Sequence, residues 1–91
     1  MRQAVFAGSF YSADPKELQK QFAAVTGTDP VPAIGVIAPH AGYVYSGNTA
    51  WRTLSSVTVP GTVVVLCPNH RGMGLPLSIS PDLEWDTPLG P

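Results

Sequence analysis

Two stretches of the sequence resemble one another: Val36-Ile37-Ala38-Pro39-His40-Ala41-Gly42 and Val65-Leu66-Cys67-Pro68-Asn69-His70-Arg71-Gly72. Each is an apolar run that stops at a proline and is followed by a histidine and a glycine. The runs that lead into them, Ala33–Ala38 and Thr62–Cys67, show no alternation of apolar and polar residues. Such runs are typical of strands that are buried on both faces, as in a parallel sheet, and three consecutive valines in the second run favour a strand further.

The connection from Pro39 to Gly61 is long enough for the right-handed crossover that joins two parallel strands. We expect Tyr43–Gly47 to form a loop and Asn48–Ser56 to form a short crossover helix. Met73–Ser80 is a candidate edge strand. The predicted fold class is therefore α/β, with parallel strands and a crossover helix.

The helix with the strongest sequence signals precedes these strands, over Pro15–Thr26. Asp14 is a favourable N-cap, Pro15 occupies the first helical position, and Glu17 completes a capping-box pattern. Gly27 supplies the predicted stop. Apolar residues recur at helical spacing on one face: Leu18, Phe22 and Val25.

The composition excludes several classes of protein. The 91 residues carry 5 Lys+Arg and 6 Asp+Glu, a net charge of −1, so a nucleic-acid-binding surface has no support. No apolar run reaches the ~18–20 residues of a membrane span, and no secretory signal opens the chain. A single cysteine excludes an internal disulfide framework and favours a reducing, cytoplasmic setting.

The low content of charged residues indicates that the chain is part of a larger protein. Charged residues make only 12% of the chain, and Arg52 is the only charged residue between Pro30 and His70. A small independent domain needs a more charged exterior. We therefore expect residues 1–91 to be part of a larger domain and to be marginally stable alone; the alternative is a small, proline-rich domain.

His40 and His70 are the main candidate site residues. Parallel strands that belong to one βαβ unit end at the same edge of the sheet, so the two imidazoles are expected to converge there. Two neutral imidazoles suit a divalent metal ion or a pair for acid–base chemistry. A metal needs a further ligand, and the spacing does not choose among Cys67, Asp82, Glu84 and Asp86.

Other residues could line the same site. Tyr43, Tyr45 and Trp85 are candidates for a pocket wall, and Arg71 could hold an anionic group of a substrate. Cys67 could act as a nucleophile with His70, but it closes an apolar strand, so a buried, inert thiol is the favoured interpretation. Nucleotide-binding glycine motifs and a nucleophile elbow are absent.

Four motifs together resemble the Memo-like family, whose prokaryotic members are called AmmeMemoRadiSam system protein B. They are Ala7-Gly8-Ser9-Phe10-Tyr11, Pro39-His40-Ala41-Gly42-Tyr43-Val44-Tyr45-Ser46-Gly47, Pro68-Asn69-His70-Arg71-Gly72 and Trp85-Asp86-Thr87-Pro88-Leu89-Gly90. The resemblance covers nearly the whole chain. It departs mildly where Ser12 and Asn48 stand in place of a common proline and Cys67 in place of a frequent glycine.

The resemblance implies an α/β fold similar to LigB-like class III extradiol dioxygenases, in a single domain about three times as long as this chain, of which residues 1–91 would be the N-terminal part. It implies that His40 and His70 are ligands of iron or copper, and that the third ligand is a cysteine far downstream, a role that Cys67 does not inherit. Redox or dioxygenase-like chemistry and a radical-SAM partner protein are implied, with the substrate unspecified. The alternative is a module without enzymatic activity that binds a peptide or an anion in the same pocket, through His40, Tyr43, Tyr45, His70 and Arg71.

Overall fold

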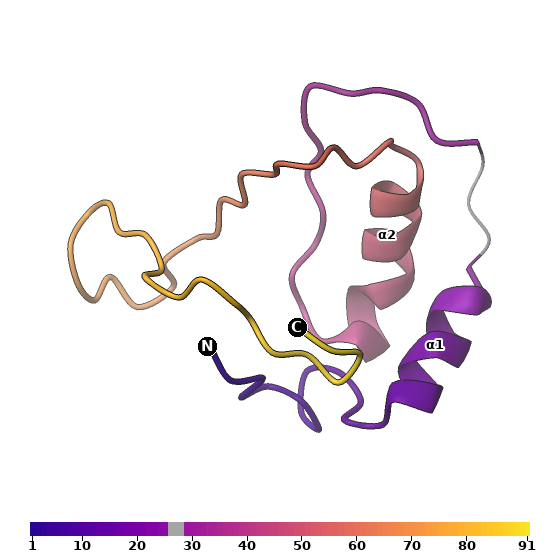
Figure 1. Cartoon of the computed structure of the whole chain (residues 1–91), viewed down its shortest axis with the longest axis horizontal. Helices are drawn as coiled ribbons and strands as arrows, with labels where there is room; N and C mark the ends of the chain where they lie inside the picture. The colour runs from indigo at the N-terminus through magenta and orange to yellow at the C-terminus, as the bar shows by residue number, and fades with distance from the viewer. Residues whose placement is uncertain (26–28) are drawn as a thin grey trace.

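The computed structural model describes residues 1–25 and 29–91, and within them the regular elements are two α-helices, α1 (Pro15–Ala23) and α2 (Tyr43–Ser55). The two helices lie side by side, and the chain beyond α2 leaves them, turns in a long loop and returns toward the helices (Figure 1). Parallel pairing within the described ranges is limited to isolated bridges: Arg2–Trp85, Ala7–Tyr11 and Val31–Val57. The bridge at Arg2 joins the N-terminal arm, residues 1–11, to the returning C-terminal segment.

Helix α1 begins as predicted, because the Asp14 carboxylate accepts a 2.8 Å hydrogen bond from the Lys16 backbone N–H. Glu17 does not close a direct capping box. Its carboxylate instead accepts from the Ser12 hydroxyl at 2.6 Å, and that hydroxyl oxygen accepts from the Asp14 N–H at 3.1 Å. Ser12 therefore relays the capping interaction.

The end of α1 differs from the prediction, since the helix stops at Ala23 rather than at residue 26. The Ala24 N–H bonds to the carbonyls of Lys20 and Phe22, and the Val25 N–H bonds to Phe22, so the last turn tightens. The predicted stop at Gly27 lies outside the described residues.

Helix α2 begins at Tyr43, five residues earlier than its predicted start at Asn48, so the expected loop over 43–47 is wrong. The Gly42 carbonyl accepts hydrogen bonds from the N–H groups of Tyr45 and Ser46, and the Tyr43 N–H donates to the Phe10 carbonyl at 2.7 Å. Tertiary pairing with the N-terminal arm thus supports a first turn that lacks a side-chain cap.

Aromatic side chains fill the space between the helices. Trp51 stacks on Phe22 with ring centroids 4.5 Å apart, and Tyr43 lies 6.1 Å from Phe22 and 5.4 Å from Tyr11. A Cβ at position 47 would stand 3.0 Å from the Tyr43 Cβ, so Gly47 leaves room for this ring within α2. Among the described residues, only Leu18 and Val25 are buried hydrophobic side chains, so the core is small.

The two predicted buried strands are extended but are neither buried nor paired as strands. Ile34 and Ile37 of the first run are 111% and 96% exposed, and the second run exposes Val64 at 81%. Although the two runs line a common groove, the rest of the described chain leaves most of their side chains uncovered, so the runs are not buried in this structure. Met73–Ser80 likewise forms no strand. The parallel sheet therefore stays a prediction.

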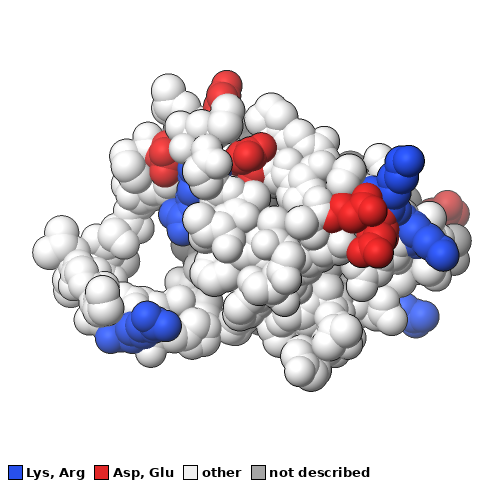
Figure 2. Space-filling model, turned by 90° about the horizontal axis from the view of Figure 1, so that it is seen from below, with Lys and Arg blue, Asp and Glu red and all other residues white. Residues whose placement is uncertain are grey.

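The chain exposes more surface than a compact protein of its mass. Its accessible surface is 7932 Å², whereas a compact monomer of this size exposes ~5,100 Å². Charged side chains gather in a few places and leave the middle of one face uncharged (Figure 2). In the described residues, neither helix has the length and apolar character that a membrane crossing requires.

Candidate metal centre

The structure brings together the two histidines that the sequence singles out. The Nε2 atoms of His40 and His70 lie 3.1 Å apart, although the residues are thirty positions apart in the chain. The ring centroids are 5.1 Å apart and the rings are tilted by 39°. Both residues are exposed, so their nitrogens are open to a ligand from solvent.

The separation of these nitrogens allows two arrangements. One neutral imidazole can donate its Nε2–H to the Nε2 of the other ring. The second arrangement is shared ligation: two imidazole nitrogens at ~2.1 Å from one ion and ~95–110° apart lie ~3.1–3.4 Å from each other. The observed distance falls at the short end of this range, so the pair fits two adjacent ligands of a single metal ion.

His40 is held by the start of α2. It stands two residues before Gly42, whose carbonyl accepts from the first turn of the helix. The Ser46 hydroxyl also donates to the Ala41 carbonyl at 3.3 Å. The segment that carries His40 is therefore tied both to a helix and, through Tyr43, to the N-terminal arm.

His70 is held differently, within a tight turn built on the side chain of Asn69. The Asn69 Oδ1 accepts hydrogen bonds from the Arg71 N–H at 3.2 Å and the Gly72 N–H at 2.9 Å, and its Nδ2 donates to the Met73 carbonyl at 2.8 Å. Gly72 has a φ of +62°, in the left-handed region that glycine adopts without strain. Sequence reasoning did not assign this role to Asn69, although Asn followed three residues later by Gly is a signal of such a turn.

The candidate third ligands named from the sequence do not join the histidines. Asp82 lies 3.6 Å from the N-terminal ammonium group, and the backbones of Glu84 and Asp86 pair with Arg2. Within residues 1–25 and 29–91, no three His, Cys, Asp or Glu side chains are grouped closely enough to hold a metal. Cys67 is exposed, so its interpretation as a buried thiol is wrong here.

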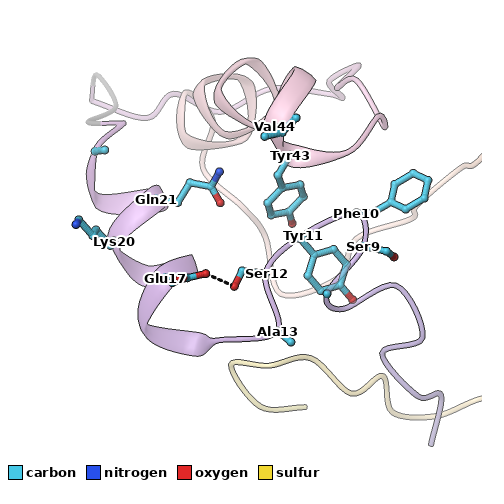
Figure 3. A pocket seen from close by; sticks show the side chains of 12 residues that line it. Ser9, Phe10, Tyr11, Ser12, Ala13, Glu17, Lys20, Gln21, Tyr43 and Val44 are labelled. Atoms are coloured by element: carbon cyan, nitrogen blue, oxygen red, sulfur yellow. Dashed lines mark hydrogen bonds between the residues drawn. The ribbon is translucent and has the colours of Figure 1, made fainter.

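The four remaining candidates lie in different surroundings, and one of them, Trp85, packs against the Arg2 guanidinium, 4.6 Å from its ring centroid. Tyr45 is 86% exposed on α2, and Arg71 is exposed beside His70. Tyr43 faces a hollow of about 740 Å³ between the N-terminal arm and the helices, near Tyr11 and Gln21 (Figure 3). Burial raises the pKa of the Tyr43 hydroxyl above its ordinary value of 10.0, and the nearby Tyr11 adds to the shift. Neither histidine lines this hollow.

The structure thus shows a convergent pair of exposed histidines, one beside the start of α2 and the other in a loop turn. Comparison with known families identifies the chain: residues 2–91 match the profile of the Memo-like protein family. The chain belongs to this family.

Curated relatives support the same membership. The chain is 42% identical to a MEMO1 family protein of Methanothermobacter thermautotrophicus over 104 residues, which cover 99% of this chain and 38% of the relative. It is 40% identical to one of Aquifex aeolicus and 44% identical to one of Archaeoglobus fulgidus, covering 35% and 34% of those proteins. The chain thus spans a little over a third of the length of these relatives. No solved structure matches it.

Proposed function

We propose that His40 and His70 supply two nitrogen ligands of a mononuclear iron or copper centre in a Memo-like protein. The observation that carries the proposal is the 3.1 Å separation of their Nε2 atoms. Neutral imidazole is a suitable ligand for both metals, and two-histidine sites with open positions are used for oxygen-dependent chemistry. The family resemblance adds a third ligand, a cysteine outside these 91 residues.

The chemistry that a bound iron or copper ion would supply is redox chemistry of the dioxygenase-like type that a LigB-like fold implies. The residues of this chain would contribute binding and orientation. The two Nε2 atoms would hold the ion, and the exposed Arg71, which follows His70 in the chain, could pair with an anionic group through its guanidinium. The substrate itself is not specified by these residues.

The same proposal covers the fold. The Ala33–Ala38 and Thr62–Cys67 segments would become neighbouring strands of a LigB-like α/β sheet when the rest of such a domain is present. The two segments line a common apolar groove together with Leu54 and Val57, and no charged side chain faces it. An uncharged groove between two extended segments suits an apolar strand.

Assignment to the AmmeMemoRadiSam system protein B group, a radical-SAM partner and a cytoplasmic location are further parts of this proposal. They are supported by the motif resemblance and by the single cysteine. Co-purification of a tagged chain from its own cells, followed by identification of an iron–sulfur partner, would test the association. Cell fractionation of the same strain would test the location.

The alternative function is binding of a peptide or anion without turnover, and the exposure of Tyr45 and Arg71 favours it. Metal stoichiometry separates the two functions. After incubation with iron(II) or copper(II) and removal of excess metal, the wild-type chain should retain metal, while a His40→Ala, His70→Ala double variant should retain none. If both proteins are metal-free, the metal-centre proposal is wrong and the binding function remains.

A further inference from the structure

We propose that Asn69 is a positioning residue for His70, whose imidazole it presents to His40. This inference rests on the proposed function of the histidine pair. It holds that one side chain outside the pair, that of Asn69, fixes the position of His70 relative to His40. The argument starts from how unequally the two histidines are supported. His40 precedes a helix of thirteen residues, whereas His70 belongs to a loop that lies away from both helices (Figure 1).

The His70 loop has few other restraints. Residues 61–79 are exposed throughout, and apart from the contact between His70 and His40, the hydrogen bonds found from residue 59 to residue 79 are those of Asn69. These bonds tie the amide side chain to three backbone groups on the far side of the histidine. They close the turn 69–73 around His70, so that its position follows from the side chain of its neighbour.

The three bonds use both capacities of the amide group, as acceptor and as donor. The Oδ1 atom accepts from two N–H groups, at Arg71 and Gly72, and the Nδ2 group donates to the carbonyl of Met73. Alanine provides neither function, and aspartate provides only the acceptor. A loop that loses these bonds gains backbone conformational freedom, and its side chains are exposed and offset little of this gain.

The expected consequence is a change in the histidine pair rather than in the helices. With the turn released, the His70 Nε2 no longer stays 3.1 Å from the His40 Nε2, and a metal must order the loop when it binds. Groups that orient metal ligands typically contribute ~10–100-fold to affinity. Because Asn69 orients only one of the two histidines, we expect Asn69→Ala to weaken copper(II) binding by the low end of this range, about tenfold.

The test uses the 91-residue chain and the variants Asn69→Ala, Asn69→Asp and Asn48→Ala. Asn48 is an exposed asparagine of α2 and serves as the matched control. Without metal, nuclear Overhauser effects between the imidazole protons of His40 and His70 report the geometry directly. They should be present in the wild type and Asn48→Ala, absent in Asn69→Ala, and weakened in Asn69→Asp. Copper(II) titration should follow the same order, with unchanged far-ultraviolet circular dichroism.

The proposal is overturned if Asn69→Ala retains the ring-to-ring effects of the wild type, whatever its affinity for copper. The proposed metal function fails separately, if the wild type shows the ring contact but binds no copper(II). In that case the Overhauser measurements alone decide whether Asn69 positions His70. Equal copper affinity of Asn69→Ala and Asn48→Ala would also count against a positioning role.

Discussion

The stack of Trp51 on Phe22 is the main contact between the two helices, and its removal offers a direct test of what holds this chain together. Truncating a fully buried tryptophan to alanine costs ~3–5 kcal/mol. Trp51 is only partly buried, so a cost below this range is expected, with ~0.5–1.5 kcal/mol of it from the ring stack at 4.5 Å. Trp51→Ala should therefore lower the free energy of unfolding by ~2 kcal/mol.

The chain contains a second tryptophan that serves as the matched control. Trp85 is 53% exposed, and its ring lies 4.6 Å from the Arg2 guanidinium carbon. An exposed cation–π contact contributes ~0.5–1 kcal/mol, so Trp85→Ala should cost no more than ~1 kcal/mol. Arg2 also pairs with the Trp85 segment through its backbone, and those bonds persist in the variant.

Urea titration followed by far-ultraviolet circular dichroism measures both variants, because α1 and α2 supply the regular structure in the described chain. The signal should be lost at a clearly lower urea concentration for Trp51→Ala than for Trp85→Ala. A Phe22→Leu background should reduce the effect of Trp51→Ala by ~0.5–1.5 kcal/mol, the coupling of the aromatic pair. Equal effects of the two tryptophan variants would refute the assignment of the helix interface as the stabilising core.

Three further outcomes follow from individual contacts. Asp14→Ala should lower the stability of α1 by ~1 kcal/mol, while Asp14→Ser should retain most of it, as read from urea titration; identical losses would contradict the N-cap assignment. Because the pKa of Tyr43 is raised, the stability that this residue contributes is complete below pH 10.0 and is lost as the pH rises through its folded pKa. Urea titrations at increasing alkaline pH should therefore show a loss of stability in the wild type that is smaller in Tyr43→Phe, and an equal loss in both proteins would contradict the assignment. The exposed apolar groove is expected to cause self-association of the chain, and Ile37→Lys places a charge in it. Light scattering should therefore show less self-association for Ile37→Lys than for Ile79→Lys, because Ile79 lies outside the groove and is about equally exposed. Equal reductions in the two variants would show that the groove is not the associating surface.

Local signals in the sequence predicted the start of α1 well. An aspartate followed by proline and a glutamate acts within one turn, so its effect does not depend on distant residues. The end of the helix was harder to predict from the sequence, because its last turn tightens and the helix ends at Ala23. The interposed Ser12, which shares the cap with Glu17, carries no separate signal in the sequence.

The start of α2 was predicted five residues too late, because a contact with a distant part of the chain sets it rather than a local signal. Tyrosine, valine, serine and glycine at 43–47 are weak helix formers, and intrinsic preference favours a loop. The helix begins there because the Tyr43 N–H pairs with the Phe10 carbonyl and the Tyr43 ring packs between Tyr11 and Phe22. A tertiary contact with the N-terminal arm overrides the local preference, and such contacts are not visible from composition or periodicity.

The apolar runs show a different limit of sequence reasoning. Their composition indicates burial, yet Ile37 and Val64 are exposed because neither run has a partner within the described residues. The convergence of the histidines was nevertheless anticipated from the echo of the two segments. It survives without the predicted sheet, since α2 supports one histidine and the Asn69 turn supports the other.

The electron paramagnetic resonance spectrum of copper(II) bound to the 91-residue chain tests the central claim most directly. Two imidazole nitrogens on one ion should produce nitrogen superhyperfine structure from two equivalent ligands, and ¹⁵N labelling of histidine alone should change that structure. The His40→Ala and His70→Ala variants should each show a single imidazole ligand. A wild-type spectrum without coordinated imidazole, or one that both variants leave unchanged, would contradict the assignment of His40 and His70 to one metal centre.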